Sequence, residues 1–585
     1  MISKTILTTS LLAAALACSL SAAEPVLEFK VNRDAPRTAG MLGPSHDEEM
    51  IYGRGSDGKE HYFAVGTDVR GHGITIWRSD DLVNWKDVGK VFTRENAPKI
   101  LNFGPRGWSY EFNAVKIDDK GEYEFLTERS PGANNYRLGS NQPFWAPCIY
   151  YNAADRTYYL YYSCSAYGTR NSFIGCAKSR TLDKGWEDCG QLIHTRTGDG
   201  KLYNAIDPTV FKDAGGKLWM IYGSFFGGIA LVELDPKDPA KLLHPGTHGK
   251  TIACRGYEKV YEQDGFQGNP TTSVRGEKFS AYGIEGASIV YNSSTKYYYL
   301  FVSYDRLDWT YHVRVGRSKE VEGPYLDYNG RPLMYDQEKQ GPEEVNGTKL
   351  IGPYRWKSTG AGWVGTGHTT LFRKKPENDF GSLFFGSNCK WQGVPGSFVG
   401  LRRVFWSDDG WPMLSPCIYA GEDTTMEDGY RVVGDELVPV NTAVGIENIL
   451  NSGDSAQWDF IVFSVTDDTT FRRIDESTVY TLRKDGTIEG GGKWTLDDRN
   501  AIIKDGLPWK APDGTTQRYA RTYWPSDEGI RMTVELPNGV KANGSCAYGW
   551  DQDRKCQTVF FTGLTDKGIA VWGQRIPPEA KPPLK

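Results

Sequence analysis

RTYYLYYS, residues 156–163, is a run of aromatic and β-branched residues that follows a turn and ends in a serine. This composition favours a β-strand, because ring-bearing and branched side chains pack well on a pleated, half-buried surface. A second strand-like run, FIGCAKS at 173–179, follows it, and then a corner that contains Leu182 and Trp186. The stretch therefore predicts a small antiparallel unit of strands.

The same pattern occurs five times between residues 40 and about 420. The paired runs are 58–66 with 73–79, 156–163 with 173–179, 216–224 with 228–234, 296–303 with 312–318, and 382–387 with 400–404. Repeated short strands at a spacing of tens of residues predict an all-β fold, a five-bladed β-propeller. The alternative is a sandwich with irregular hairpins, but the Ser or Gly that closes each first strand favours the propeller. The largest insertions are expected at 89–145, 235–280 and 324–365, as long loops at the rim.

The composition changes near Gly421-Glu422-Asp423, and a length of 585 residues already argues for more than one domain. Strand-like runs at 457–463, 479–482, 492–496, 557–562 and 568–572 alternate in polarity, which fits a small antiparallel β-barrel. We expect a propeller over 24–425 and a barrel domain over 430–585.

An export signal is predicted at residues 1–23. Lys4 supplies a positive start, residues 6–20 are apolar, and Ser21-Ala22-Ala23 resembles a cleavage site. Lipoprotein processing at Cys18 is the alternative. The chain is therefore expected to be secreted or periplasmic, or else an outer-surface lipoprotein. No later apolar segment is long enough to span a membrane.

Charge and aromatic content restrict the kind of partner. The net charge is −5 with Lys and Arg scattered, so neither nucleic acid nor a membrane surface is expected as a partner. Aromatic residues make up 13% of the chain. Their flat faces stack on sugar rings, although an ordinary aromatic β core has the same composition.

Nine cysteines remain when Cys18 is set aside, and none forms a CxxC pattern, which argues against a zinc cluster. The odd number leaves at least one thiol free or paired between chains. Cys546 and Cys556 flank a turn and could form a disulfide in an oxidising compartment.

Three carboxylates stand at the start of different copies of the repeat. Asp47 lies in SHDEEMI, Asp207 in YNAIDP, and Glu285 inside the otherwise apolar run GIEGASIV. Strands nearest a propeller axis deliver residues into one central funnel, so these acids are expected to meet. Burial of Glu285 would raise its pKa and let it hold a proton. A single Asp more often caps a turn, but three acids together suit glycosidic cleavage.

These motifs resemble glycoside hydrolase family 43, and within it the two-domain extracellular endo-1,5-α-L-arabinanases. The resemblance covers about 40–420 in the family's order and rests on SHD at 45–47, FWAP at 144–147, NAIDP at 204–208, GSFFGG at 223–228 and IEG at 284–286. Residues 430–575 are similar to the family's C-terminal barrel, a lipocalin-like domain. Glu48, Cys148 and Phe226 depart from the family pattern, where Pro, Asp and Trp are usual.

The resemblance implies a function for particular residues. Asp47 would be the general base, Glu285 the general acid and Asp207 the residue that tunes and orients the acid, in an inverting cleavage of arabinan. GTGHT at 365–369 would place His368 at a calcium ion in the channel. The implied substrate-binding residues are Trp145, Asn204, Ala205, Ile206, Ser224, Phe225 and Phe226.

Other readings of the same motifs remain open. Besides an endo-arabinanase acting on plant cell-wall arabinan or arabino-oligosaccharides as a monomer, the chain could be an exo-acting α-L-arabinofuranosidase or β-xylosidase. A non-catalytic, glycan-binding propeller is the third alternative. For Trp145 ordinary core packing, and for His368 a hydrogen-bonded core position, are the alternative interpretations.

Overall fold

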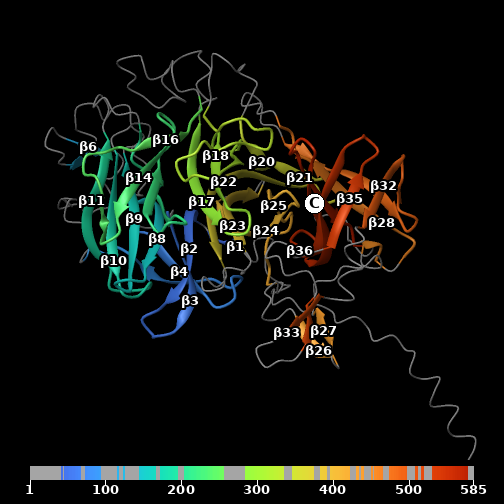
Figure 1. Ribbon diagram of the computed structural model, residues 1–585, viewed down its shortest axis with the longest axis horizontal. Coiled ribbons are helices and arrows are strands. Elements are labelled where there is room, and N and C mark those ends of the chain that lie inside the picture. The colour runs from blue at the N-terminus through green and yellow to red at the C-terminus, as the bar shows by residue number, and fades with distance from the viewer. Residues whose placement is uncertain are drawn as a thin grey trace, which may run out of the picture.

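A computed structural model of the protein shows two β domains side by side (Figure 1). The structure describes residues 41–43, 45–67, 73–93, 96, 115–117, 123–125, 144–165, 172–195, 203–255, 283–307, 309–334, 346–373, 383–391, 396–421, 430–433, 436–439, 449–451, 453–465, 474–496, 507–510, 516–519 and 530–577. The predicted export signal, Cys18 and most of the 89–145 insertion lie outside these residues.

The first domain is a propeller of five antiparallel sheets, as the repeat predicts. Blade one contains β2 (His46–Arg54), β3 (Glu60–Thr67), β4 (Thr75–Ser79) and β5 (Lys86–Lys90), and blade two contains β8 (Trp145–Asn152), β9 (Thr157–Ser165), β10 (Ser172–Ser179) and β11 (Glu187–Thr195). Blade three contains β12 (Thr209–Lys212), β13 (Leu218–Tyr222), β14 (Ile229–Asp235), β15 (Asp238–Leu242) and β16 (Lys250–Ala253). Blade four contains β17 (Ile284–Asn292), β18 (Tyr297–Tyr304), β19 (His312–Ser318) and β20 (Thr348–Ile351).

The fifth blade closes the ring with help from the start of the chain. It contains β21 (Tyr354–Trp356), β22 (Ala361–Arg373), β23 (Leu383–Trp391), β24 (Phe398–Trp406) and β25 (Pro412–Leu414). The short β1 (Met41–Leu42) pairs antiparallel with β24. A strand from the beginning of the propeller thus completes the last blade, which removes an open sheet edge.

Two of the expected insertions are partly wrong. Residues 235–280 supply β15 and β16, the outer strands of blade three, and 324–365 supply β20 and β21. These strands are only three to five residues long, too short to show the aromatic pattern that marks the central strands. The sequence pattern also begins each blade one strand late, because the innermost strand precedes the aromatic run.

Aromatic and aliphatic side chains from neighbouring blades form the propeller core. One cluster joins blades one and two through Phe63, Val65, Leu160 and Phe173, all fully buried. Burial of such side chains contributes about 25 cal/mol per Å² of apolar surface, and it binds each blade to the next rather than stabilising a blade alone.

The second domain is a closed eight-stranded barrel, which confirms the predicted architecture. Its strands are β28 (Ser455–Val462), β30 (Thr478–Arg483), β31 (Thr487–Ile488), β32 (Gly492–Leu496), β35 (Ile530–Glu535), β36 (Lys541–Asp551), β37 (Cys556–Thr565) and β38 (Ala570–Arg575). Trp458, Leu482 and Phe561 fill its interior. Three two-stranded ribbons complete the described elements: β6 (Val115–Ile117) with β7 (Tyr123–Phe125), β26 (Tyr430–Val433) with β27 (Glu436–Pro439), and β33 (Leu507–Lys510) with β34 (Thr516–Tyr519).

An apolar seam joins the two domains. Trp572 and Phe560 of the barrel belong to the same buried cluster as Phe405 and Trp406 of blade five. The short β29 (Asp475–Glu476), just before the barrel strand β30, also pairs in parallel with β21 of the propeller. The domains therefore share a core and a sheet instead of being joined by a linker alone.

The suggested Cys546–Cys556 disulfide is wrong. Cys546 pairs across the β36–β37 hairpin with Phe561, and Cys556 pairs with Asp551. Five residues of extended strand span about 17 Å, far beyond the Cα separation that a disulfide allows. The nine cysteines in the described residues are all free thiols. Within the described ranges, no helix has the length and apolar character needed to cross a membrane.

Candidate active site

The innermost strand of every blade has a residue at positive φ within it or just before it. Equivalent positions hold Asp47 (φ 57°), Ala146 (φ 41°), Asp207 (φ 57°), Gly286 (φ 52°) and His368 (φ 50°). In four of the blades a break in strand register falls at this point. A bulge of this kind turns a side chain away from the ladder and toward the propeller axis. Left-handed backbone is costly for residues other than glycine, and such strain concentrates at functional sites.

The predicted acids therefore use two different positions of the same bulge. Asp47 and Asp207 occupy the left-handed position itself, whereas Glu285 stands one residue earlier, as Trp145 does in blade two. In blade four the left-handed position is the glycine Gly286, whose missing Cβ would lie 2.8 Å from the Cα of His368. Any larger residue would collide there with blade five.

A ring of hydrogen bonds fixes the bulges from blade to blade. Each bulge N–H is accepted by a side chain from the preceding blade. Asn388 Oδ1 accepts from Asp47 at 3.0 Å, Thr67 Oγ1 from Ala146 at 2.8 Å, Ser163 Oγ from Asp207 at 3.0 Å, and Ser303 Oγ from His368 at 2.8 Å. In these four bulges the acceptor stands on the strand that pairs with the innermost strand of the preceding blade.

Blade three supplies the exception, and the exception involves a candidate catalytic group. Gly223 occupies the place of the ring hydroxyl and has no side chain to offer, so Asp207 Oδ2 accepts the N–H of Gly286 at 3.2 Å. The carboxylate of Asp207 thereby contacts the backbone next to Glu285. Asp207 is 8% exposed, and it positions the strand that carries Glu285.

Asp47 lies in a cage of polar groups from blades one and five. His46 Nδ1 is 2.6 Å from Oδ2, His368 Nδ1 is 3.2 Å from Oδ1, and the Asn388 amide donates to Oδ1 at 3.1 Å. The Thr67 hydroxyl donates to Oδ2 at 3.2 Å. Burial disfavours the charged form, but the two imidazoles and these hydrogen bonds outweigh it and hold the pKa of Asp47 well below its usual range.

Glu285 has the opposite environment. Burial raises its pKa to about 7, with the nearby charge of Asp47 adding to the effect. Ser224 donates a hydrogen bond to Oε2 at 2.7 Å, and this bond together with one from Tyr311 moderates the rise. Burial also raises the pKa of Asp207 well above its usual range, and the charge of Glu285 contributes. The site thus combines one ionised carboxylate with a pair of carboxyl groups that retains a proton.

The predicted aromatic residues Trp145, Phe225 and Phe226 lie in segments close to the catalytic acids in sequence or in hydrogen bonding. Trp145 is half-buried and shares its bulge position with Glu285. Phe225 and Phe226 are half-buried and both have positive φ, 54° and 29°. The N–H of Phe225 donates to the carbonyl of Ile284 at 2.8 Å, which ties this loop to the strand of Glu285.

The other predicted substrate-binding residues are buried. Asn204 is 5% exposed, and its Oδ1 accepts a hydrogen bond from the Ser172 hydroxyl at 2.6 Å. Ala205 and Ile206 are 0% and 6% exposed, and the N–H of Ala205 donates to Thr195 Oγ1 at 3.0 Å. In the structure these three residues brace the segment that ends in Asp207.

The predicted calcium position offers few protein ligands. Nδ1 of His368 already contacts Asp47, and in the described part of the chain no group of three or more His, Cys, Asp or Glu side chains is arranged to hold a metal ion. Calcium prefers six to eight oxygen ligands. The described side chains do not form such a cage, so the calcium ion stays a prediction that rests on the resemblance.

Sequence reasoning missed four residues of this site: Thr67, Tyr311, Asn388 and, as a partner of Asp47, His46. A signal was present for Thr67 and Asn388, because each stands at or beside the end of an aromatic strand, where the repeat places a small polar residue. Nothing near Tyr311 in the sequence marks it. Its ring fills the space beside Gly367, where a Cβ would lie 2.2 Å from it.

An ionised carboxylate beside a pair of carboxyl groups that retains a proton, at the axis of a propeller, suits the cleavage of a glycosidic bond. Comparison with known proteins agrees. The glycosyl hydrolases family 43 model matches residues 126–412, and a C-terminal lipocalin-like domain model matches 452–573.

Individual relatives cover most of the chain. An extracellular endo-α-(1→5)-L-arabinanase of Bacillus subtilis is 26% identical over 87% of this chain and 90% of its own length. An extracellular exo-α-(1→5)-L-arabinofuranosidase of Cellvibrio japonicus is 30% identical over 59% of this chain and 81% of its own length. The crystal structure of an endo-1,5-α-L-arabinanase from Thermotoga petrophila superposes with a TM-score of 0.61 at 23% identity, over 92% of this chain and 99% of that one. The chain belongs to glycosyl hydrolase family 43.

Proposed function

We propose that this protein is a secreted, monomeric endo-arabinanase that cleaves internal α-1,5-L-arabinofuranosyl bonds with inversion. The observation that carries the proposal is the opposed protonation of Asp47 and Glu285 within one site. Support for the endo mode comes from relatives that match both domains, since the endo-arabinanase of Thermotoga petrophila matches 88% of this chain. The endo-acting relative from B. subtilis matches 87% of this chain, whereas the exo-acting one matches 59%.

In this mechanism Glu285 donates its proton to the leaving glycosidic oxygen as the bond to the anomeric carbon breaks. Asp47, ionised, takes a proton from a water molecule that attacks that carbon from the opposite face. Glu285 ends deprotonated and Asp47 protonated, and proton exchange with solvent restores both. Asp207 holds the strand of Glu285, and these two buried carboxyl groups together retain a proton, while the charge of Asp47 further favours the protonated form of Glu285.

Product analysis on debranched linear arabinan tests the proposal. An endo enzyme releases a ladder of oligosaccharides early in the reaction, and proton NMR shows the inverted anomer first. Release of arabinose alone would establish the exo alternative that the C. japonicus relative suggests. Activity on xylan but not on arabinan would overturn the substrate assignment, and a retained anomer would overturn the role of Asp47.

Calcium at His368 is tested separately from the reaction. If the ion is bound, it takes most of its ligands from water, so dialysis against EDTA should remove it. The resemblance predicts a lower Tm and lower activity after dialysis, both restored by added calcium. Unchanged Tm and activity, with no calcium found by elemental analysis of the undialysed protein, would contradict the prediction.

A further inference from the structure

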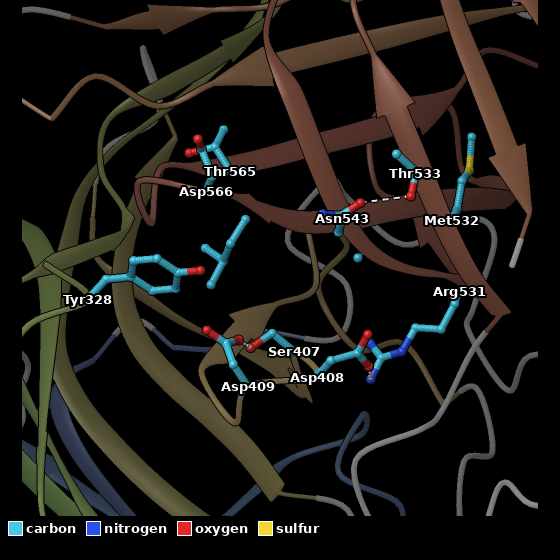
Figure 2. A pocket seen from close by; sticks show the side chains of 12 residues that line it. Tyr328, Ser407, Asp408, Asp409, Arg531, Met532, Thr533, Asn543, Thr565 and Asp566 are labelled. Carbon is cyan, nitrogen blue, oxygen red and sulfur yellow. Dashed lines mark hydrogen bonds and ion pairs between the residues drawn. The ribbon is translucent and has the colours of Figure 1, made fainter.

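A cavity of about 410 Å³ lies at the seam between blade five and the barrel (Figure 2). Its propeller side is formed by Tyr328 and the turn at Ser407 to Asp409, and its barrel side by β35, β36 and the β37–β38 turn. This volume falls within the range of about 300–1,000 Å³ that is typical of small-molecule sites. The domain seam is also a place where such sites commonly form.

The cavity presents hydrogen-bond donors and acceptors in fixed positions. Arg531 makes an ion pair with Asp408 at 3.2 Å and also donates to the carbonyl of Trp406 at 2.9 Å, so its guanidinium is anchored to the propeller. The Thr533 hydroxyl donates to Asn543 Oδ1 at 2.7 Å, which orients the amide and directs its NH₂ group away from Thr533.

Two carboxylates and a phenol face the same space (Figure 2). Asp409 accepts from the Ser407 hydroxyl at 2.5 Å, and Asp566 stands on the exposed β37–β38 turn. The ring of Tyr328 packs at 5.4 Å against Trp411 and reaches in beside Gly568, where a Cβ would lie 2.5 Å from it. Gly568 thus leaves room for the tyrosine at the mouth of the cavity.

The chemistry of the lining selects among ligand classes. Three carboxylates against one guanidinium, itself paired with Asp408, disfavour an anion. The described acids do not converge in the groups of three that hold a metal ion. A sugar hydroxyl both donates and accepts hydrogen bonds, so it can use the carboxylates, the amide and the guanidinium together. Leu564 adds apolar contact for ring C–H groups.

We propose that this seam cavity is a second carbohydrate-binding site, which holds a short segment of the same neutral pentose polymer away from the catalytic acids. The inference rests on the proposed function for the identity of the sugar. A second point of attachment keeps a polymer chain near the active site and raises its effective concentration. The gain applies to a long substrate and not to a trimer.

Isothermal titration with linear α-1,5-arabinotetraose tests the site directly. The Glu285→Gln protein, in which hydrolysis is stopped, is expected to bind two molecules. The double variant Glu285→Gln/Asn543→Trp, with the cavity filled by an indole, is expected to bind one. The matched control Glu285→Gln/Asn538→Trp changes an exposed asparagine in the β35–β36 turn, outside the cavity, and should still bind two. One binding site in all three proteins overturns the proposal.

A kinetic measurement tests the second site without the need to detect weak binding by titration. The ratio of kcat/KM on debranched arabinan to kcat/KM on arabinotriose should fall about tenfold in Asn543→Trp and in Asp566→Ala. It should keep the wild-type value in Asn538→Trp. Equal ratios in all variants overturn the second site. If wild-type protein cleaves neither substrate, the proposed function itself fails; titration of the same proteins with xylotetraose then decides whether the cavity binds a pentose chain.

Discussion

The pKa of Glu285 is set mainly by burial, and hydrogen bonds from two hydroxyl groups oppose the effect of burial. Burial raises its pKa to about 7, and the hydrogen bond from Ser224 opposes that rise because it stabilises the ionised form. As the general acid must be protonated, kcat/KM should fall as the pH rises through about 7.

Replacing Ser224 by alanine removes the donor, so the alkaline limb of the pH profile should move upward by about one unit. Glu285→Gln should lower kcat by about 10²–10⁴-fold and remove that limb from the residual activity. An unshifted limb in Ser224→Ala, with wild-type Tm, would contradict the assignment of Glu285 as the acid.

Glu48 is a buried acid for which the mechanism has no use. It is 3% exposed, and burial raises its pKa to about 8. An unfolded glutamate ionises near 4.5. Below that pH both states are protonated and the group costs nothing; between about 4.5 and 8 the unfolded chain ionises first and stability falls. Above about 8 the cost is constant.

Glu48→Met should therefore stabilise the protein by about 1–3 kcal/mol at pH 8 and by much less at pH 4.5. Urea unfolding at both pH values measures the difference. Glu60→Gln, at an exposed position of β3, is the control and should change stability equally little at both. A pH-independent effect of Glu48→Met would show that Glu48 is ionised in the folded state.

At the scale of the strand, the bulge ring explains how five unlike sequences present side chains to one axis. Asn388 is the member that serves the general base, since it accepts from the backbone of Asp47 and donates to its carboxylate. It is fully buried. Loss of the Asn388 side chain should let the strained backbone at Asp47 relax. The orientation of the Asp47 carboxylate should then change more than the binding of substrate by the enzyme.

Asn388→Ala should thus lower kcat by about 10–100-fold with a small change in KM, because a misplaced catalytic group affects the transition state. Ser415→Ala removes a fully buried serine that bonds Cys417 at 2.9 and 3.1 Å in blade five, and it serves as the control for lost stability. If both variants lose Tm and kcat to the same extent, the effect of Asn388 is structural only.

Across the whole molecule, the shared core makes the barrel a structural part of the propeller. Trp572 is fully buried, with its ring 5.2 Å from Tyr354 and 5.1 Å from the guanidinium of Arg402, both propeller residues. Blade five, which carries His368 and Asn388, therefore packs on one side against the site and on the other against the barrel.

The chain should consequently unfold in a single calorimetric transition. Trp572→Ala, which leaves a large cavity in the seam, should lower the stability of both domains by about 3–5 kcal/mol and shift that one transition. Two separate transitions in the wild-type protein would contradict the shared core. A variant in which only the barrel transition moves would contradict it as well.

The sequence by itself determined the kind of fold. Alternating and aromatic runs act locally, so five blades, a barrel and the three acids could be predicted from residues near one another in the chain. The resemblance of their motifs to family 43 added the roles of those acids, which remain to be tested by experiment.

Only the tertiary structure decided which groups surround each acid. Asp47 and Asn388 are far apart in the chain and meet because the propeller closes between blades five and one. Packing of blade four on blade five places Gly286 against His368, and packing of the barrel on the propeller joins Trp572 to blade five. Protonation depends on burial and on these long-range contacts, and neither is visible in a local pattern of residues.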